Sequence, residues 1–290
     1  MRKKFHIVHL IPNPTMHGLK GYREVIETVQ WGLLALGHEA SMETNKIEAQ
    51  ATNIVLGFQM LSEAALDQLP PDTIVYNFEQ LYGADSLQLK PAFRAAAQRF
   101  QVWEYSERNL PMWETLGAVR PVLHVPVGWA PILVRIPPSE IMDIDVLFYG
   151  LTSPERLTIF HDISMAGIRF VFACGLYGGS RDHLIARSKL ILNLSLYKSR
   201  IFEVVRASYL FANAKAVVSE FHPDMFVEPD LRDAAMFTAP NNIAATCRML
   251  LDNEAARINL EKRGEELFRR RDVRQILRTA LDATFAAAQA

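Results

Sequence analysis

The chain has 290 residues, more than one hydrophobic core usually holds, so its length predicts two domains. Half of the residues are apolar and 22% are charged, a composition that excludes an intrinsically disordered chain. The 31 basic residues nearly balance the 32 acidic ones, so no overall field favours nucleic acid, anionic lipid or acidic substrates.

Cysteine content and hydropathy indicate the compartment. Cys174 and Cys247 have neither CxxC nor Cys/His spacing, which argues against a disulfide framework and a structural zinc site. The basic N-terminus leads into a short apolar run that stops at residues 12–14, which indicates a buried strand and not a signal peptide. No stretch reaches the roughly 18 to 20 apolar residues of a membrane span. We therefore expect a cytoplasmic protein without a transmembrane segment, and peripheral membrane contact stays open.

The N-terminal half alternates short apolar runs with amphipathic segments. The runs are FHIVHLI, NIVLGF, TIVYNF, FQVWEY and VLHVPV, and a helical stretch covers about residues 21–36. Strands that alternate with helices are typical of a parallel sheet with helices on its faces. The segment 128–145 holds three prolines and no sustained period, which predicts a connection between domains.

The same alternation restarts after this connection. DVLFYG, IRFVFACG, KLILNLS and AKAVVSE predict strands, and the tail from Asn241 is largely helical, with Gly264 as the expected break between two helices. The sequence thus predicts an α/β protein with two Rossmann-like domains facing a central cleft and with C-terminal helices. The N-terminal domain covers 1–135 and the C-terminal domain 136–290.

Ligands of such sheets bind beyond the carboxyl ends of the strands, so the residues after each strand are candidates for the site. His17, in the first such loop, can act as a general base towards an acceptor hydroxyl, or it is a structural histidine. Glu79 follows the strand TIVYNF and is an equally suitable base, or an ordinary solvated or helix-capping acid. The loop of His17 lacks GxGxxG, and no Ser/His/Asp triad or metal-ligand cluster is assigned by spacing.

The segment FYGLTSPERLTIF predicts an anion site in the C-terminal half. Gly150 ends a strand, Ser153 occupies a cap position and Arg156 opens the following helix. A diphosphate can bind the free amide groups there while Arg156 neutralises it. The alternative is a capped helix with exposed charges.

Two further segments carry candidate ligand contacts. Tyr177 lies in a glycine-rich turn, where it either stacks on a nucleobase or packs in the core. Lys198 follows the strand KLILNLS and is a candidate phosphate contact. Glu203 and Arg206 are spaced i and i+3, which favours a simple intrahelical ion pair. The alternative has Glu203 binding ribose hydroxyls while Lys198 or Arg206 meets phosphate.

The segment FEVVRASYLFANAKAVVSE, preceded by ARSKLILNLS, resembles the C-terminal domain of GT-B glycosyltransferases, especially the group-1 type. The match is best over residues 144–221, and the N-terminal half agrees in architecture only. The resemblance places the family's ribose-binding glutamate at Glu203, the glycine of its first C-domain strand at Gly150, and a following basic residue at Arg156. In retaining members a second glutamate stands where this chain has Ser195, which puts retaining stereochemistry in doubt.

The resemblance implies a metal-independent, hexosyltransferase-like enzyme that moves a sugar from a nucleotide-sugar donor to a hydroxyl acceptor. The 1–135 domain would bind the acceptor, which is a glycan, a lipid or a small molecule, and the 136–290 domain would bind the donor. Arg156, Lys198 and helix N-termini would stabilise the leaving diphosphate. The nucleotide sugar is a co-substrate, and neither a cofactor nor nucleic acid is expected. A non-catalytic nucleotide-sugar or glycan-binding protein is the first alternative, and a sugar-nucleotide epimerase is the second.

Overall fold

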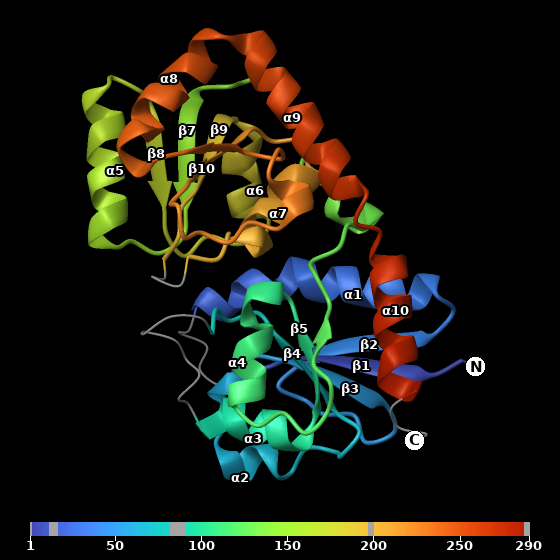
Figure 1. The fold of residues 1–290 in the computed structure, drawn as a ribbon. Coiled ribbons are helices and arrows are strands. Elements are labelled where there is room, and N and C mark those ends of the chain that lie inside the picture. Colours follow the sequence, from blue (N-terminus) through green and yellow to red (C-terminus); the bar gives the residue numbers. More distant parts are fainter. Residues whose placement is uncertain (1, 12–16, 82–90, 197–199, 287–290) are drawn as a thin grey trace. The chain divides into compact units, whose positions relative to one another are not determined.

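The computed structural model describes residues 2–11, 17–81, 91–196 and 200–286 (Figure 1). The chain divides into two compact units, Met1–Ile132 with Arg271–Ala290, and Leu133–Arg270.

Unit 1 is built on a six-stranded parallel sheet of order β2-β1-β3-β4-β5-β6. Its strands are β1 (Lys4–His9), β2 (Glu39–Thr44), β3 (Thr52–Leu56), β4 (Ile74–Asn77), β5 (Gln101–Glu104) and β6 (Leu123–His124). β4 and β5 are buried along their whole length, whereas the edge strand β2 is mostly exposed. Burial on both faces explains why the central strands read as continuous apolar runs.

The helices of unit 1 fill the connections between these strands and close the unit. They are η1 (His17–Tyr22), α1 (Arg23–Ala35), η2 (Phe58–Met60), α2 (Glu63–Leu66), α3 (Pro91–Arg99), η4 (Glu107–Asn109), α4 (Leu110–Thr115) and α10 (Val273–Ala286). The core between the sheet and α3 and α4 contains an aromatic cluster, with Phe93 5.4 Å from Phe58 and 5.9 Å from Trp113 between ring centroids.

The last helix, α10, belongs to unit 1 and lies beside α1 (Figure 1). Trp129 N donates to Arg271 O at 2.7 Å, and Trp103 Nε1 donates to Thr284 Oγ1 at 3.0 Å. Gly32 permits the close packing of the two helices, because a Cβ there would lie 2.6 Å from Leu277 Cδ1. The domain boundaries predicted from the sequence placed this helix in the C-terminal domain, residues 136–290. They differ from the structure because local sequence patterns do not reveal contacts between distant segments.

Unit 2 holds a five-stranded parallel sheet of order β11-β10-β9-β7-β8. Its strands are β7 (Ile144–Tyr149), β8 (Phe170–Ala173), β9 (Ser188–Asn193), β10 (Val217–Glu220) and β11 (Met236–Thr238). The helices are α5 (Pro154–Met165), α6 (Gly179–Ala186), α7 (Val204–Ala212), η6 (Pro229–Leu231), η7 (Pro240–Asn242), α8 (Ile243–Asp252) and α9 (Glu254–Arg269), and η5 (Pro131–Leu133) leads into the unit. The predicted α/β class with two Rossmann-like domains is confirmed.

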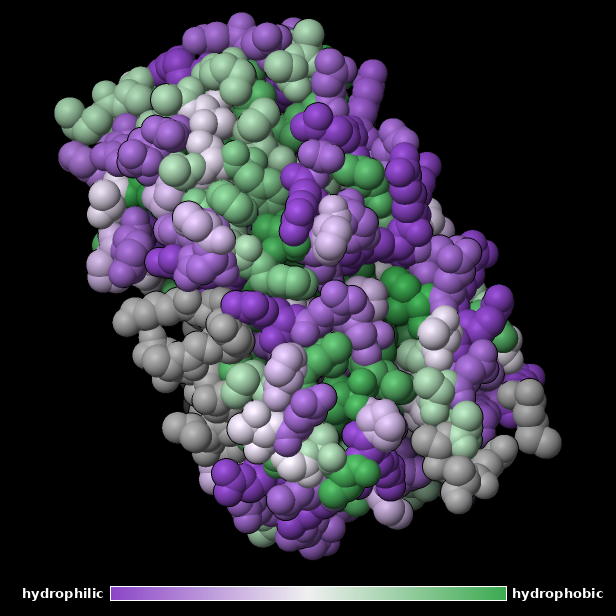
Figure 2. All heavy atoms as spheres, viewed as in Figure 1, coloured by the Kyte–Doolittle hydropathy of each residue, from purple (hydrophilic) through white to green (hydrophobic). Residues whose placement is uncertain are grey.

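Hydrophilic side chains line the outer face of α9 in the space-filling view of Figure 2. On this helix Arg269 pairs with Glu265 at 2.7 Å and Arg270 with Glu266 at 2.5 Å. Among the described helices, none combines the length and the apolar character that crossing a bilayer requires.

Gly264 does not break a helix as the sequence predicted, because α9 runs through it. A Cβ at this position would lie 2.8 Å from Ala234 O and 3.0 Å from Phe211 Cδ1. The glycine is therefore required by close packing of the helix against the rest of unit 2.

Gly264→Ala is expected to lower the free energy of unfolding by about 1 to 2 kcal/mol, because overpacking against a carbonyl outweighs the gain of about 1 kcal/mol in helix propensity. Urea unfolding measures the change. Gly179→Ala in α6 is the matched control, since no atom lies within 4 Å of the added Cβ. A stabilised Gly264→Ala variant would show that the contact with Ala234 O relaxes at no cost.

Candidate functional site

Polar side chains gather where the central strands of the first sheet end. Glu79 follows β4 by two residues and is half-buried. Its Oε1 atom accepts a hydrogen bond from the Tyr22 hydroxyl at 2.8 Å and another from Gln59 Nε2 at 2.8 Å. Tyr22 ends η1 and Gln59 lies in η2, so three segments of unit 1 orient this carboxylate at the carboxyl edge of the sheet. An oriented carboxylate at such an edge can accept a proton from a substrate hydroxyl.

The other predicted base, His17, opens η1, the element that Tyr22 ends. Its backbone thus belongs to a segment that is tied to Glu79 through the Tyr22 hydroxyl. The side chain of His17 lies outside the described residues, so its role as a base remains a prediction.

Sequence reasoning missed a second carboxylate in this unit. Glu104 ends β5 and is completely buried. Its carboxylate accepts hydrogen bonds from Trp113 Nε1 at 2.7 Å and from Ser106 N at 2.9 Å, and also from the side-chain amides of Asn77 and Asn109. Burial raises the pKa of Glu104 to about 7 although these donors oppose the shift. An acidic residue inside the apolar run FQVWEY was the only sequence signal of it.

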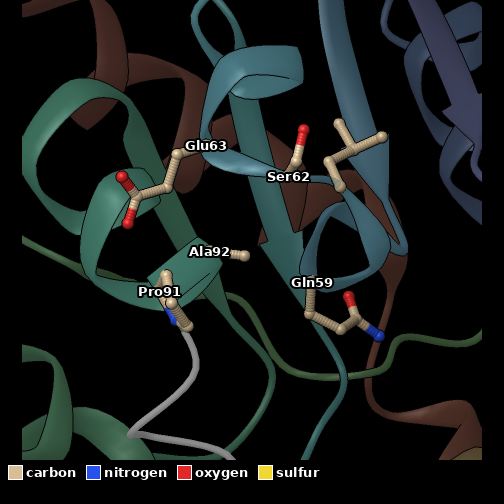
Figure 3. A pocket seen from close by; sticks show the side chains of 6 residues that line it. Gln59, Ser62, Glu63, Pro91 and Ala92 are labelled. Carbon is tan, nitrogen blue, oxygen red and sulfur yellow. The ribbon is translucent and has the colours of Figure 1, made fainter.

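A pocket of about 390 Å³ adjoins Gln59 (Figure 3). Its walls come from the segment after β3 and from the start of α3, and they are formed by Gln59, Leu61, Ser62, Glu63, Pro91 and Ala92. Gln59 contributes to this wall and also donates to Glu79, so the pocket and the candidate base share one side chain. The exposed Glu63 carboxylate makes the lining acidic.

In unit 2, residues that the sequence suggested separately meet at the end of β7. Gly150 has φ +140°, and a Cβ there would lie 3.0 Å from Arg206 Nη2. Arg206 Nη1 donates to Asn193 Oδ1 at 3.2 Å, and the guanidinium lies 5.2 Å from the Phe148 ring centroid. Arg206 therefore reaches from α7 to the ends of β7 and β9, where an anionic ligand can meet it.

Ser153 caps α5 as predicted, since its hydroxyl accepts a hydrogen bond from Arg156 N at 3.3 Å. The Arg156 side chain, however, is only 2% exposed. It donates from Nε to Ser195 O at 3.1 Å, from Nη1 to Leu151 O at 2.6 Å, and from Nη2 to Leu194 O. Arg156 thus braces the loop after β9 against the loop after β7. Its contact with a diphosphate remains a prediction.

The remaining predicted donor residues are placed as follows. Glu203 is half-buried at the N-cap position of α7, and Tyr177 is half-buried in the turn before α6. Lys198 lies outside the described residues. Arg206 contacts the end of β9, and its contact with a phosphate remains a prediction.

Four polar groups at the ends of β9 and β10 complete this edge. Ser195 N donates to Glu220 Oε1, and Glu220 Oε2 lies 3.4 Å from His222 Nε2. Asn193 is 1% exposed, and its Nδ2 has no hydrogen-bond partner within the described residues. Buried donors are nearly always satisfied, so this amide suits a ligand or ordered water at the site. Glu220 was missed because it reads as the last residue of the strand AKAVVSE.

Among the described residues no group of three or more His, Cys, Asp or Glu side chains is arranged to hold a metal ion.

Comparisons with known proteins place this arrangement in a known fold. No protein-family model and no curated protein sequence matches the chain. HepE from Anabaena, solved in complex with UDP and glucose, is 13% identical, with a TM-score of 0.63 over 97% of this chain and 99% of that chain. AviGT4, a glycosyltransferase involved in avilamycin A biosynthesis, is 13% identical, with a TM-score of 0.61 over 97% of both chains.

Sucrose-phosphate synthase from Thermosynechococcus elongatus is 12% identical, with a TM-score of 0.63 over 99% of this chain and 100% of that chain. At these identities the likeness establishes the fold, which is that of the GT-B glycosyltransferases.

Proposed function

We propose that this protein is a glycosyltransferase that moves a sugar from a nucleotide-sugar donor to a hydroxyl acceptor. The observation that carries the proposal is Glu79, a carboxylate held by two side-chain donors at the carboxyl edge of the first sheet. The full-length likeness to proteins solved with UDP or UDP-glucose supports a nucleotide-linked substrate.

The proposed donor site lies at the carboxyl edge of the second sheet. Arg206 and Lys198 would meet the diphosphate, and Glu203, at the N-cap of α7, would accept hydrogen bonds from ribose hydroxyls. Gly150 leaves room at the end of β7, where a larger residue would collide with Arg206. Tyr177 would stack on the base. Preorganised cations and amide groups stabilise a leaving diphosphate on their own, so we propose a metal-independent reaction without a cofactor.

The proposed chemistry is a direct displacement. The acceptor hydroxyl attacks the anomeric carbon, its proton passes to the Glu79 carboxylate, and the bond to the nucleoside diphosphate breaks with the electron pair leaving on the phosphate oxygen. His17 is the other candidate for the proton acceptor. Ser195, at the position where retaining relatives carry a glutamate, favours this inverting route.

The pocket beside Gln59 is the proposed acceptor site. Its polar lining offers an amide, a hydroxyl and a carboxylate, from Gln59, Ser62 and Glu63. These groups suit a hydroxyl-rich, uncharged sugar or small molecule better than an anionic one, because Glu63 repels negative charge. We infer a hexose donor and a cytoplasmic location, the latter supported by two free cysteines, Cys174 and Cys247.

Nucleotide binding tests the donor site directly. Calorimetry with UDP, GDP, CMP and ADP, with and without magnesium, should find one nucleoside diphosphate that binds without the metal. Arg206→Ala is expected to weaken that binding by about 10- to 100-fold, because a charge-assisted contact with phosphate is lost. Arg169→Ala is the control, since Arg169 pairs with Asp145 on an exposed surface. Equal nucleotide affinities of Arg206→Ala and wild type would show that Arg206 does not contribute to nucleotide binding.

A non-catalytic nucleotide-sugar binding protein is the second candidate. Ser195 favours it, because the position lacks the carboxylate of retaining relatives. Tight binding of a nucleotide sugar without turnover in the presence of any acceptor would favour this candidate over the transferase.

A further inference from the structure

Two asparagine amides lie between Glu104 and the main chain that carries Glu79. Asn77 Nδ2 donates to Glu104 Oε2 at 2.7 Å and to Glu79 O at 2.9 Å. Asn109 Nδ2 donates to Glu104 Oε1 at 3.0 Å and to the same Glu79 O at 2.9 Å. Each oxygen of the Glu104 carboxylate therefore accepts a hydrogen bond from one of the two amides. Both amides also donate to the carbonyl oxygen of Glu79.

The oxygen atoms of the same two amides accept hydrogen bonds from the main chain of residues 79–81. Asn77 Oδ1 accepts a hydrogen bond from Glu79 N at 3.0 Å, and Asn109 Oδ1 accepts one from Leu81 N at 2.9 Å. The main chain of residues 79–81 is thus held at two N–H groups and one carbonyl. All four hydrogen bonds to these groups come from Asn77 and Asn109, the two side-chain amides that donate to Glu104.

Above its pKa of about 7 the Glu104 carboxylate is ionised and only accepts hydrogen bonds, whereas a side-chain amide has one donor end and one acceptor end. Glu104 therefore fixes which way both amides point, with their NH₂ groups towards itself and their oxygens towards Glu79 N and Leu81 N. Glutamine at position 104 would turn an NH₂ group towards at least one of the four donors, and one amide would lose its orientation.

The burial of Glu104 is costly, because desolvation of a carboxylate outweighs the donors around it and raises its pKa to about 7. A neutral side chain would fill the same space without that cost. The four donors are drawn from β4, η4, α4 and the segment after β5, so the carboxylate organises several elements at once.

We propose that Glu104 is a positioning residue, which acts through Asn77 and Asn109 to hold residues 79–81 so that the Glu79 carboxylate stays on Tyr22 and Gln59. The catalytic consequence rests on the proposed role of Glu79. The structural part of the proposal does not depend on that role.

A double-mutant cycle tests the catalytic part. Glu104→Gln is expected to lower kcat by about 10- to 100-fold, because a small misplacement of a reacting group has an effect of this size. The KM of the donor should stay near the wild-type value. In a Glu79→Gln background the same substitution should cause no further loss, because the group it positions is gone. An equal loss in both backgrounds would reduce Glu104 to a general structural role and overturn the proposal.

Hydrogen exchange tests the structural part without any activity. In Glu104→Gln the backbone amides of Glu79 and Leu81 should exchange at least tenfold faster than in wild type, and in Asn109→Ala the Leu81 amide should respond more than that of Glu79. Asn53→Ala is the matched control, because Asn53 is a buried amide that binds main chain before β3. It should leave the exchange of Glu79 and Leu81 unchanged.

The two readouts separate the possible failures. Unchanged exchange of the Glu79 and Leu81 amides in both Glu104→Gln and Asn109→Ala would overturn the positioning role. Accelerated exchange together with wild-type kcat in Glu79→Gln would instead support the positioning role and refute the proposed function of Glu79.

Discussion

Glu79→Gln is expected to lower kcat by about 10²- to 10⁴-fold, the range that a general base contributes. Glutamine keeps the size of the side chain and an oxygen for Tyr22 and Gln59, but it does not accept the proton of the acceptor hydroxyl. The affinity for the nucleotide should stay at the wild-type value, because the proposed donor contacts come from unit 2. Steady-state kinetics and calorimetry on the same preparation measure both quantities.

Glu48→Gln is the matched control for this substitution. Glu48 is a half-buried glutamate of the same unit and precedes β3, at the amino end of that strand. Its Oε1 atom accepts a hydrogen bond from Gln50 N at 3.2 Å. The control should retain wild-type kcat. If Glu79→Gln retained it too, the proton would have another acceptor, and His17 would become the base to test.

Arg156→Ala is expected to lower the free energy of unfolding by about 3 to 5 kcal/mol. The substitution leaves the carbonyls of Ser195, Leu151 and Leu194 without their donor and opens a cavity beside Phe148. Arg156→Lys should recover only part of the loss, because a single ammonium cannot reproduce the planar fork that reaches three carbonyls. Urea unfolding of the variants gives the comparison.

Arg169→Ala is a suitable reference for the stability measurement. Arg169 itself is mostly exposed, and Asp145 keeps its ion pair with Lys189 in the variant, so we expect a change below about 1 kcal/mol. A change of this small size in Arg156→Ala as well would mean that the loops after β7 and β9 keep their positions without the buried guanidinium.

The sequence was sufficient for the central strands and for the edge strands β6 and β8, but it did not predict the edge strands β2 and β11. β1, β3, β4, β7 and β9 are largely buried on both faces and therefore lie in predominantly apolar runs. The edge strand β2 has the sequence EASMET and is mostly exposed, so no hydrophobic period marks it. β11 has only three residues. Edge strands of this kind are defined by pairing with a neighbour, which a local pattern does not contain.

The same limit applies to packing. Gly264 reads as a helix break because glycine usually ends helices, but in α9 it makes room for Ala234 O. The tail helix α10 joins unit 1 through Trp129 and Trp103, which precede it by well over a hundred residues. Composition and periodicity within the tail are the same whichever unit it joins.

The sequence predicted where the candidate site residues lie, but not which residues they contact. The strand-end rule identified Glu79, Gly150 and Ser153 before their partners were known. The contact of Gly150 with Arg206, and the use of Arg156 as a brace of main chain, depend on how distant segments meet. Glu104 was missed because a buried charged group looks like any other residue of a strand until its donors are seen.

The most direct test of the transferase is acceptor-dependent release of the nucleoside diphosphate by the wild-type protein. The nucleotide identified by calorimetry is supplied as its hexose conjugate, with a panel of uncharged sugars and small polyols as acceptors and EDTA present. The account predicts that release accelerates with one class of acceptor and that mass spectrometry finds one added hexose on it. Tight donor binding with neither release nor an added hexose, on any acceptor and also after magnesium is restored, would contradict the transferase and favour a binding protein.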